Sequence, residues 1–530
     1  MSGRVPASAD ATGARAYHDA TKHSWQSVRS GGHFLDWEIK PFPFKIYPDA
    51  PTVPLPREVA APAMPALETL ARDVAGAGDG PLDLDRLAAL LFFTAGVTKK
   101  KAYPGGEAVH FRAAASTGAL YEVEVYVVAG QVAGLEPGVY HFSPGDFVLR
   151  RLRRGDFRGV LRDAAGEGAR VASAPATLVL SALYWRNTWK YQARAFRHFF
   201  WDAGTMLANL LATAVAVGVP TRVLLGFADA EVNGLLGLDT AREASLALVP
   251  LGTGAGPPPP APPLEPLGLA TLPLSAREVD YPLVRQACSA TSLASGAAAR
   301  TWVSETGGRD GAGAPREPVS HPLAPLAAPP DAPLGQVILR RGSTRQFDRQ
   351  PIAFGALSTI LDAAVREAPL DVRPPVDTYL LVHGVEGLPP GAYVHDAAQR
   401  GLRQLRAGEF RSEGGYLCLD QPIGADASVV VFFLADLAAV LARHGERGYR
   451  AVSLAAGLRG GRMYLAAYAL GLGASGLTFY DDDVVRFFSP DAEGKDAIFV
   501  TALGRARRAE RAGGLRPVEG RIQPLRPGER

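Results

Sequence analysis

The chain repeats itself at a fixed spacing of 253 residues. GLEPGVY at 134–140 matches GLPPGAY at 387–393, and GDFR at 155–158 matches GEFR at 408–411. Further matches at this spacing are Arg194 with Arg447, Phe196 with Tyr449, Arg197 with Arg450, Gly204 with Gly457, Gly218 with Gly471, and Asp229 with Asp482. A self-match that holds one register over about a hundred residues indicates one structural unit used twice. The repeat predicts two domains of the same fold, arranged like a homodimer fused into one chain.

The spacing of apolar residues predicts the same order of elements in both halves. An amphipathic helix comes first, then a strand, a turn with a short hairpin, a core strand, and a long Ala- and Leu-rich helix that ends at a glycine. These elements are expected at 82–94 and 352–365, at 123–128 and 378–383, at 176–182 and 428–434, and from Arg197 and Arg450 onward. Strands and helices in this order predict an α+β fold, with a mixed sheet flanked by helices in each half.

Composition and the repeat together divide the chain into four segments. We expect an N-terminal domain at 1–252, a connector at 253–334, a C-terminal domain at 335–508 and an Arg-rich tail at 509–530. The connector is rich in Pro and Gly at both ends, which is typical of an extended, semi-rigid linker. Residues 280–304, between those ends, are expected to form a helix that packs on one of the domains.

Several classes of protein are disfavoured by composition. An apolar content of 47% with 21% charged residues is that of a soluble globular protein, and a net charge of +3 spread along the chain predicts no nucleic-acid partner. Cys288 and Cys418 have no CxxC spacing, which excludes a disulfide framework and a cysteine zinc site and favours a reducing compartment. No metal is expected. The apolar run at 207–227 is broken by Gly and Pro, and predicts a buried helix and a strand rather than a membrane span. We expect a cytoplasmic protein.

The segment RRGSTRQF at 340–347 has the composition of a phosphate site. Arginine forks bind phosphate through paired charge-assisted hydrogen bonds, and a serine hydroxyl can bind a remaining oxygen. Arg340, Arg341, Ser343 and Arg345 are the candidate ligands. The alternative is a solvated basic turn after a short helix. The N-terminal half offers only TKHS at 21–24 in place of this segment, so we expect one strong phosphate site per chain, with two as the alternative.

The segment RRGSTRQF also resembles the phosphate-binding opening of nitroreductase-like flavin enzymes, and most of the chain is similar to the SagB-type (ThcOx-like) dehydrogenases of that superfamily. This resemblance implies an FMN cofactor. It also implies that Arg505, after the last strand, returns to the FMN phosphate. The segment from Arg112 resembles the family's PSxGALYP loop, which implies a wall for the flavin pyrimidine edge made of Ser116, Thr117, Gly118 and Ala119. Ser475 and Gly476 are implied near flavin N5 and O4, and an ordinary turn or helix end is the alternative for both loops.

The pair Lys190-Tyr191 matches a lysine-tyrosine pair that the SagB-type family places at its active site. Without the resemblance, such a pair near a helix start is usually an amphipathic surface. With it, Lys190 and Tyr191 are the candidate catalytic residues, one as base and the other as charge stabiliser. Both side chains ordinarily have a pKa near 10, so the base must have a shifted pKa to act near neutrality.

Three functions follow from these residues. The resemblance implies oxidation of azoline rings to azoles in a ribosomal peptide or related natural product, with partner enzymes of a biosynthetic assembly. The first alternative is an NAD(P)H-dependent flavin reductase of nitro compounds or quinones. The second is a flavin-poor scaffold that docks a peptide or partner enzyme. FMN is favoured over a dinucleotide because no strand is followed by GxGxxG with a downstream acid.

Overall fold

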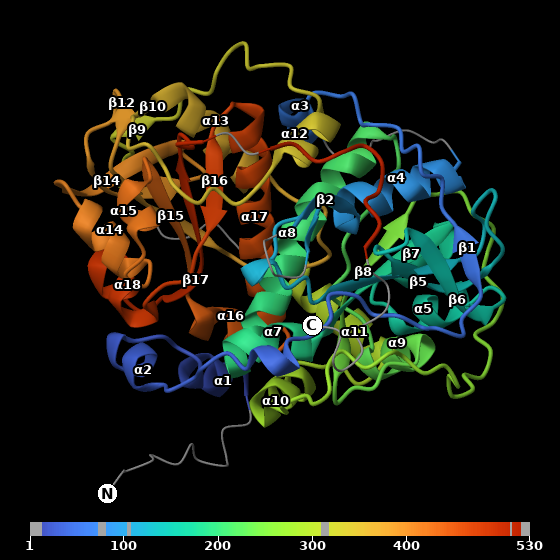
Figure 1. Cartoon of the computed structure of the whole chain (residues 1–530). Helices are drawn as coiled ribbons and strands as arrows, with labels where there is room; N and C mark the ends of the chain where they lie inside the picture. The colour runs from blue at the N-terminus through green and yellow to red at the C-terminus, as the bar shows by residue number, and fades with distance from the viewer. Residues whose placement is uncertain (1–12, 73–80, 103–107, 309–316, 509–510, 521–530) are drawn as a thin grey trace, which may run out of the picture.

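Two sheets form the frame of the protein, one in each half (Figure 1). The computed structural model describes residues 13–72, 81–102, 108–308, 317–508 and 511–520. In order across the N-terminal sheet, the strands are β1 (Thr52–Pro54), β6 (Val148–Arg154), β5 (Gly138–Ser143), β4 (Val123–Ala129), β7 (Ala176–Leu183) and β8 (Glu243–Leu251). The C-terminal sheet runs β16 (Gly473–Gly476), β17 (Asp496–Gly504), β15 (Val429–Ala435), β11 (Asp377–Val382), β13 (Gly391–Asp396), β14 (Gly401–Ala407) and β9 (His321–Pro322).

The two-domain α+β architecture predicted from the repeat is confirmed. The register of the repeat is kept by whole elements, since β5, β6 and β8 begin and end 253 residues before β13, β14 and β17. All strand pairings within the two large sheets are antiparallel, where mixed sheets were expected. Hairpin connections such as those between β4, β5 and β6 require no crossover and produce antiparallel neighbours.

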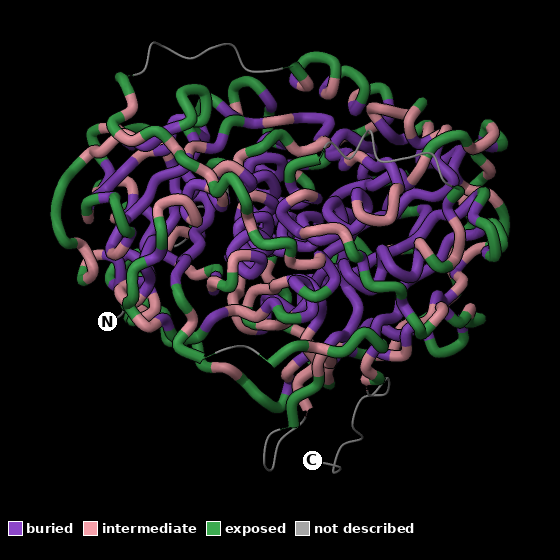
Figure 2. Tube along the Cα trace, turned by 90° about the horizontal axis from the view of Figure 1, so that it is seen from above, coloured by how far each residue is buried: buried purple, intermediate pink, exposed green. Residues whose placement is uncertain are grey.

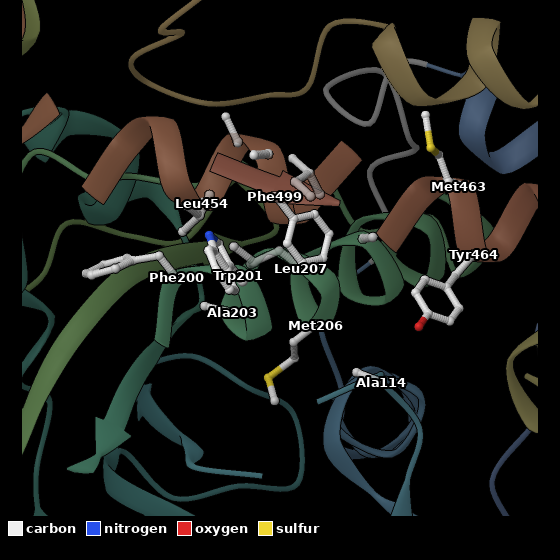
Figure 3. Packing of buried hydrophobic residues seen from close by; sticks show 14 of the residues in the cluster. Ala114, Phe200, Trp201, Ala203, Met206, Leu207, Leu454, Met463, Tyr464 and Phe499 are labelled. Carbon is white, nitrogen blue, oxygen red and sulfur yellow. The ribbon is translucent and has the colours of Figure 1, made fainter. Parts of the chain in front are cut away.

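Two long helices, α8 (Ala195–Ala216) and α17 (Gly448–Ala469), pack against each other where the halves meet (Figure 1). Glycines allow the close approach, because a Cβ on Gly204 would lie 2.5 Å from the Leu454 carbonyl oxygen. Trp201 of α8 also packs on Phe499 of β17, with 5.4 Å between ring centroids (Figure 3). One continuous core therefore spans both halves, as the buried backbone in Figure 2 shows.

The helix α8 belongs to the stretch 184–216, which is long and apolar enough to cross a membrane by composition alone. Of its most apolar window, 94% is buried inside the protein, mainly against α17 and α4 (Leu84–Ala95). The helix is therefore a buried helix of the core, as the sequence predicted.

The remaining elements surround these sheets and central helices. The helices are α1 (Ala14–Ala20), α2 (Trp25–Ser30), η1 (Trp37–Ile39), α3 (Ala66–Ala71), η3 (Thr117–Ala119), α5 (Arg158–Ala164), α6 (Gly168–Ser173), α7 (Tyr184–Tyr191), η4 (Gln192–Arg194), α9 (Asp229–Leu236), α10 (Pro282–Ala290), α11 (Gly296–Thr306), α12 (Leu334–Arg340), α13 (Phe354–Val365), α14 (Arg411–Leu417), α15 (Pro422–Asp426), α16 (Leu437–His444) and α18 (Asp481–Phe488). Two short sheets pair β2 (Val97–Lys101) with β3 (Val109–Arg112) and β10 (Ile352–Ala353) with β12 (Val385–Glu386).

The segment 280–304 contains two helices, α10 and α11, and α10 repeats the role of α1. Arg197 of α8 donates to the Thr21 hydroxyl after α1, and Arg450 of α17 donates to the Thr291 hydroxyl after α10. These threonines are 270 residues apart. The TKHS segment at 21–24 is thus the counterpart of residues after α10, and not of the arginine-rich segment at 340–347.

The described part of the tail, 511–520, returns to the N-terminal half. Its backbone amides at Gly514 and Val518 donate to Thr98 and Val97 of β2, at 3.1 and 3.0 Å. The remaining tail residues, 509–510 and 521–530, lie outside the described residues.

Candidate active site

The segment 340–347 lies beside the residues that follow the last strand, β17. The pairing consists of a bridge between Phe347 and Ala506, a hydrogen bond from the Asp348 amide to the Arg505 carbonyl at 3.1 Å, and one from the Arg507 amide to the Gln346 carbonyl at 3.0 Å. It holds Arg505 next to the segment that carries Ser343 and Arg345. Both Arg345 and Arg505 are exposed, and neither forms an ion pair or side-chain hydrogen bond with another described residue.

The other arginines of the segment bind backbone carbonyls. Arg340 donates to the Tyr468 carbonyl at 2.9 Å, while Arg341 donates to the carbonyls of Ala113 and Arg112, at 3.0 and 3.3 Å. Arg341 therefore joins the two halves. Because Arg340 ends α12 and Arg341 begins the following turn, their side chains reach different neighbours.

The short strand β16, which follows α17, packs on the same segment. The Thr344 amide donates to the Ala474 carbonyl at 2.9 Å, and the Gly476 amide donates to the Tyr464 hydroxyl at 2.6 Å. Ser343 lies 3.1 Å from that hydroxyl. Ser475 is buried and Gly476 is exposed. The structure thus brings Ser343 and Gly476 together through one tyrosine.

Asp202 of α8 anchors the predicted wall at 116–119 through hydrogen bonds. This carboxylate accepts the Ser116 hydroxyl at 2.6 Å, the Thr117 hydroxyl at 2.7 Å and the Thr117 amide at 2.7 Å. Gly118 and Ala119 of the wall, and Tyr121 after it, have φ of 64°, 55° and 52°. Two of them carry side chains that make this conformation costly, so the anchoring by Asp202 overrides a local preference.

A second buried carboxylate, Glu122, follows the wall. Its side chain is 0% exposed and lies near Asp202, and the Ser116 hydroxyl reaches both groups. Burial, and then the Asp202 charge, raise the pKa of Glu122 well above its ordinary value of 4.5. Burial also raises the pKa of Asp202, although its three hydrogen bonds oppose this. Burial thus shifts the pKa of both carboxyl groups in the direction that favours their neutral forms.

Lys190 and Tyr191 end the helix α7 next to this wall. A Cβ on Gly118 would lie 2.8 Å from the Tyr191 hydroxyl, and the Lys190 ammonium lies 5.3 Å from the Tyr191 ring centroid. Burial raises the pKa of Tyr191, and the charges of Asp202 and Glu122 raise it further, whereas Arg345 opposes the shift. Burial, followed by the charge of Arg345, lowers the pKa of Lys190. Arg345 of the C-terminal half therefore lies within electrostatic reach of both predicted catalytic residues of the N-terminal half.

The backbone directly after this pair is strained. Gln192 has φ 51° and ψ −139°, a region that favours glycine, and its counterpart Gly445 has φ 59° and ψ −167°. The N-terminal half thus keeps the turn but replaces the glycine that suits it.

The two similar halves place a second position, equivalent to the candidate site, on the opposite side of the molecule. There the two halves bond to each other directly, and we call it the closed side; the side of the candidate site is the open side. Leu370 pairs with Val223, and the Asp371 carboxylate accepts the amides of Leu225 and Gly226, at 2.8 Å from the nearer oxygen in each case. Asp371 stands 253 residues after Gly118. On the open side, no backbone hydrogen bond joins 116–119 to 475–478 among the residues that the structure describes. Residues 369–372 are thus the counterpart of the wall at 116–119.

Four buried residues near the wall were missed as site candidates. They are Glu122, Asn187, His198 and Asp202, and His198 Nδ1 lies 2.8 Å from Asn187 Oδ1. Their counterparts in the other half are Pro375, Val440, Ala451 and Ala455. The signal available in the sequence was a polar residue in the N-terminal half that aligns with an apolar residue 253 positions later.

The arrangement agrees with what known proteins show. The family model described as "Nitroreductase family" matches residues 78–253 and 338–504. A protein of Methanocaldococcus jannaschii described as a nitroreductase is 31% identical over 172 residues, which cover 32% of this chain and 81% of that protein. McbC, the microcin B17-processing protein of Escherichia coli, is 26% identical over 136 residues, which cover 25% of this chain and 50% of McbC. The crystal structure of a nitroreductase from Anabaena variabilis matches with a TM-score of 0.72 at 27% identity, over 93% of this chain and 99% of that one.

Proposed function

Because the chain belongs to the nitroreductase family through both of its halves, we propose that it is an FMN-dependent dehydrogenase that carries one flavin between its two domains. The observation that carries this proposal is that the segment 340–347 of one half reaches the other: Arg341 donates to the Ala113 carbonyl at 3.0 Å, and Arg345 lies within electrostatic reach of Lys190 and Tyr191. Ligand sites commonly form between domains, and here each half contributes a different part.

The residues on the open side suit FMN. Arg345 and Arg505, which have no carboxylate partner among the described residues, and the Ser343 hydroxyl would bind the phosphate. The small residues at 116–119 would lie along the pyrimidine edge, and Ser475 and Gly476 along the N5 side. On the closed side, Leu370 and Asp371 bond directly to the other half at the positions equivalent to the wall, which supports one flavin per chain.

The substrate that we propose is an azoline ring in a ribosomal peptide or a related natural product, by similarity to the peptide-processing protein McbC. Oxidation to the azole removes two hydrogens, one as a proton and one as a hydride. FMN supplies the hydride acceptor when it is bound. Lys190, whose pKa is lowered, takes the proton on its neutral amine. Tyr191, whose pKa is raised, stays protonated and donates a hydrogen bond to the heteroatom on which charge develops.

Flavin content and turnover test this proposal together. Purified protein is expected to carry about one FMN per chain, and Arg345→Ala with Arg505→Ala should lose most of it, since each lost contact to a charged group costs about 1.5–3 kcal/mol. Lys190→Ala and Tyr191→Phe should keep the flavin spectrum and lose azoline oxidation. Arg443→Ala and His444→Phe, at the same positions of the other half, are the matched controls. Unchanged turnover in both N-terminal variants would remove the pair from the mechanism.

The M. jannaschii and A. variabilis relatives are described as nitroreductases, which favours a second candidate function, the reduction of nitro compounds. Steady-state oxidation of NADH or NADPH with such an acceptor separates the two reactions. A colourless purified protein would instead favour the scaffold function.

A further inference from the structure

A cavity of about 340 Å³ lies between α3, α8, α17 and the segment that follows α13, and none of its lining residues belongs to the candidate active site. Its charged lining residues are Arg72, Arg222, Arg366, Glu367, Arg373 and Arg462. Five guanidinium groups around one cavity repel one another, and burial adds a further cost for Arg462, the buried one of the five.

The cavity is the pseudo-symmetric counterpart of the predicted phosphate site. Leu211 and Val215 line it, and they precede by 253 residues Tyr464 and Tyr468, which contact Ser343 and Thr344 on the open side. Arg222 likewise precedes Ser475 by 253 residues.

One hydrogen bond in each half supports this equivalence. Asn209 of α8 donates its side-chain amide to the Ala113 carbonyl at 3.1 Å, and Arg462 of α17 donates to the Arg366 carbonyl at 2.6 Å. Both pairs are separated by 253 residues. The closed side has therefore replaced a neutral amide by a guanidinium and kept the bond to the carbonyl.

Arg462 differs from the other arginines of the cavity. It is 7% exposed and forms no ion pair with any residue in the described part of the chain. The others have carboxylate partners: Glu68 for Arg72, Glu167 for Arg222 at 2.9 Å, Asp362 for Arg366 at 2.6 Å, and Glu367 for Arg373 at 3.0 Å. Burial, and then the charges of Arg459 and Arg366, lower the pKa of Arg462 to about 10. Arg462 thus remains charged near neutrality, and a buried cation without a counter-ion is costly.

We propose that this cavity is an anion site, in which Arg462 and the free donors of the neighbouring arginines bind a small phosphate-bearing molecule without a flavin ring. The ring is excluded because Leu370 and Asp371 close the adjoining space by bonding to Val223, Leu225 and Gly226. Phosphate is the matching chemistry because guanidinium groups bind it through paired hydrogen bonds. The site serves a role separate from the proposed flavin reaction, and it stands on the cavity and on Arg462.

Isothermal titration of the flavin-loaded protein with pyrophosphate and with inorganic phosphate, at constant ionic strength, tests the proposal. We expect one site per chain and at least a tenfold weaker affinity in Arg462→Asn. That variant removes the charge and retains an amide that can reach the Arg366 carbonyl, as Asn209 does for Ala113. Arg486→Met, which removes an exposed arginine of α18, is the charge-matched control and should bind like the original protein.

Ala212→Met is a second variant that fills the cavity from α8 and leaves every arginine in place. It should also abolish binding, so the proposal does not depend on the folding of Arg462→Asn alone. Absence of binding to the original protein, or equal affinity in Arg462→Asn, would overturn the anion site. Titration with FMN separates the two sources of phosphate: a second flavin per chain that is lost in Arg462→Asn would show that a ring does enter. Flavin content and turnover of Arg462→Asn should not change, which distinguishes this site from the proposed active site.

Discussion

At the scale of single residues, the surroundings of Lys190 and Tyr191 assign them different protonation states. Lys190 has a pKa below its ordinary 10.5, and turnover that requires its neutral amine should rise with pH through that lowered pKa to a plateau. The raised pKa of Tyr191 predicts no loss of activity from phenol ionisation below about pH 10. A pH profile of kcat checks this, and the ascending limb should be absent from the residual activity of Lys190→Ala. A limb that persists in that variant would assign it to another group.

The strained turn at Gln192 gives a prediction about stability. Gln192→Gly relieves a conformation that costs side-chain residues about 1–3 kcal/mol and adds backbone freedom to the unfolded chain worth roughly 0.5–1 kcal/mol. We expect a net gain near 1 kcal/mol, measured as a higher thermal midpoint, with lower turnover because Tyr191 is held less firmly. Gly445→Gln, at the matching turn, should lower the midpoint. A destabilised Gln192→Gly would show that the side chain has a stabilising contact.

Sequence alone reached these residues unevenly. Lys190 and Tyr191 were predicted from resemblance to a family motif, and Arg345 from the arginine-rich composition of the segment 340–347. Asp202 and Glu122 were missed, because their alignment with Ala455 and Pro375 was not compared, and only the fold shows that both lie beside Ser116. The directions in which Arg340 and Arg341 point depend on where α12 ends, which the motif does not state.

At the scale of elements, two buried ion clusters lock the halves together. Asp481, the first residue of α18, accepts Arg194 and Arg197 of the other half at 3.0 and 2.7 Å, and Asp229, the first residue of α9, accepts Arg447 and Arg450 at 2.7 Å each. Each carboxylate thus pairs with the arginines that begin the opposite central helix.

Acid should unfold the protein partly through Asp481. The two arginines lower the pKa of Asp481 to about 2, although burial opposes them, so its stabilising contribution is complete above its unfolded value near 4 and is lost as pH falls toward 2. Asp481→Asn should cost about 3–5 kcal/mol at pH 7, because two buried cations lose their partner. Denaturant unfolding at pH 7 and at pH 3 measures both effects. The gap between the variant and the original protein should narrow at pH 3, and a gap that stays constant would contradict the assignment.

The order of elements was predictable because the repeat of apolar spacing survives in both halves. The equivalence of α1 and α10 was not predictable, because the hairpin of β2 and β3 adds residues to the N-terminal half between α4 and β4. Upstream of that hairpin the spacing becomes 270 rather than 253, so a comparison at one offset loses the match. One helix was expected at 280–304, whereas the structure has two, α10 and α11, and the role of α10 was not predicted.

At the scale of the whole molecule, the proposed flavin site depends on both halves at once. Chains 1–278 and 279–530, made separately, should each bind FMN at least tenfold more weakly than the intact protein. Mixing them should restore flavin binding and part of the activity, because the core between α8 and α17 re-forms and the connector only raises effective concentration. Visible spectra and turnover of the mixture are the measurements. Tight FMN binding and full turnover by 279–530 alone would contradict a shared site.

The closure formed by Leu370 and Asp371 has a consequence for how such a protein changes over generations. In a dimer of identical chains, one gene encodes both pockets, so a substitution that seals one seals the other and removes the activity. In the fused chain, codons 370 and 371 belong to one pocket only. The sealed pocket is then free of selection for flavin, while the open pocket stays under it, and the two can accumulate substitutions independently.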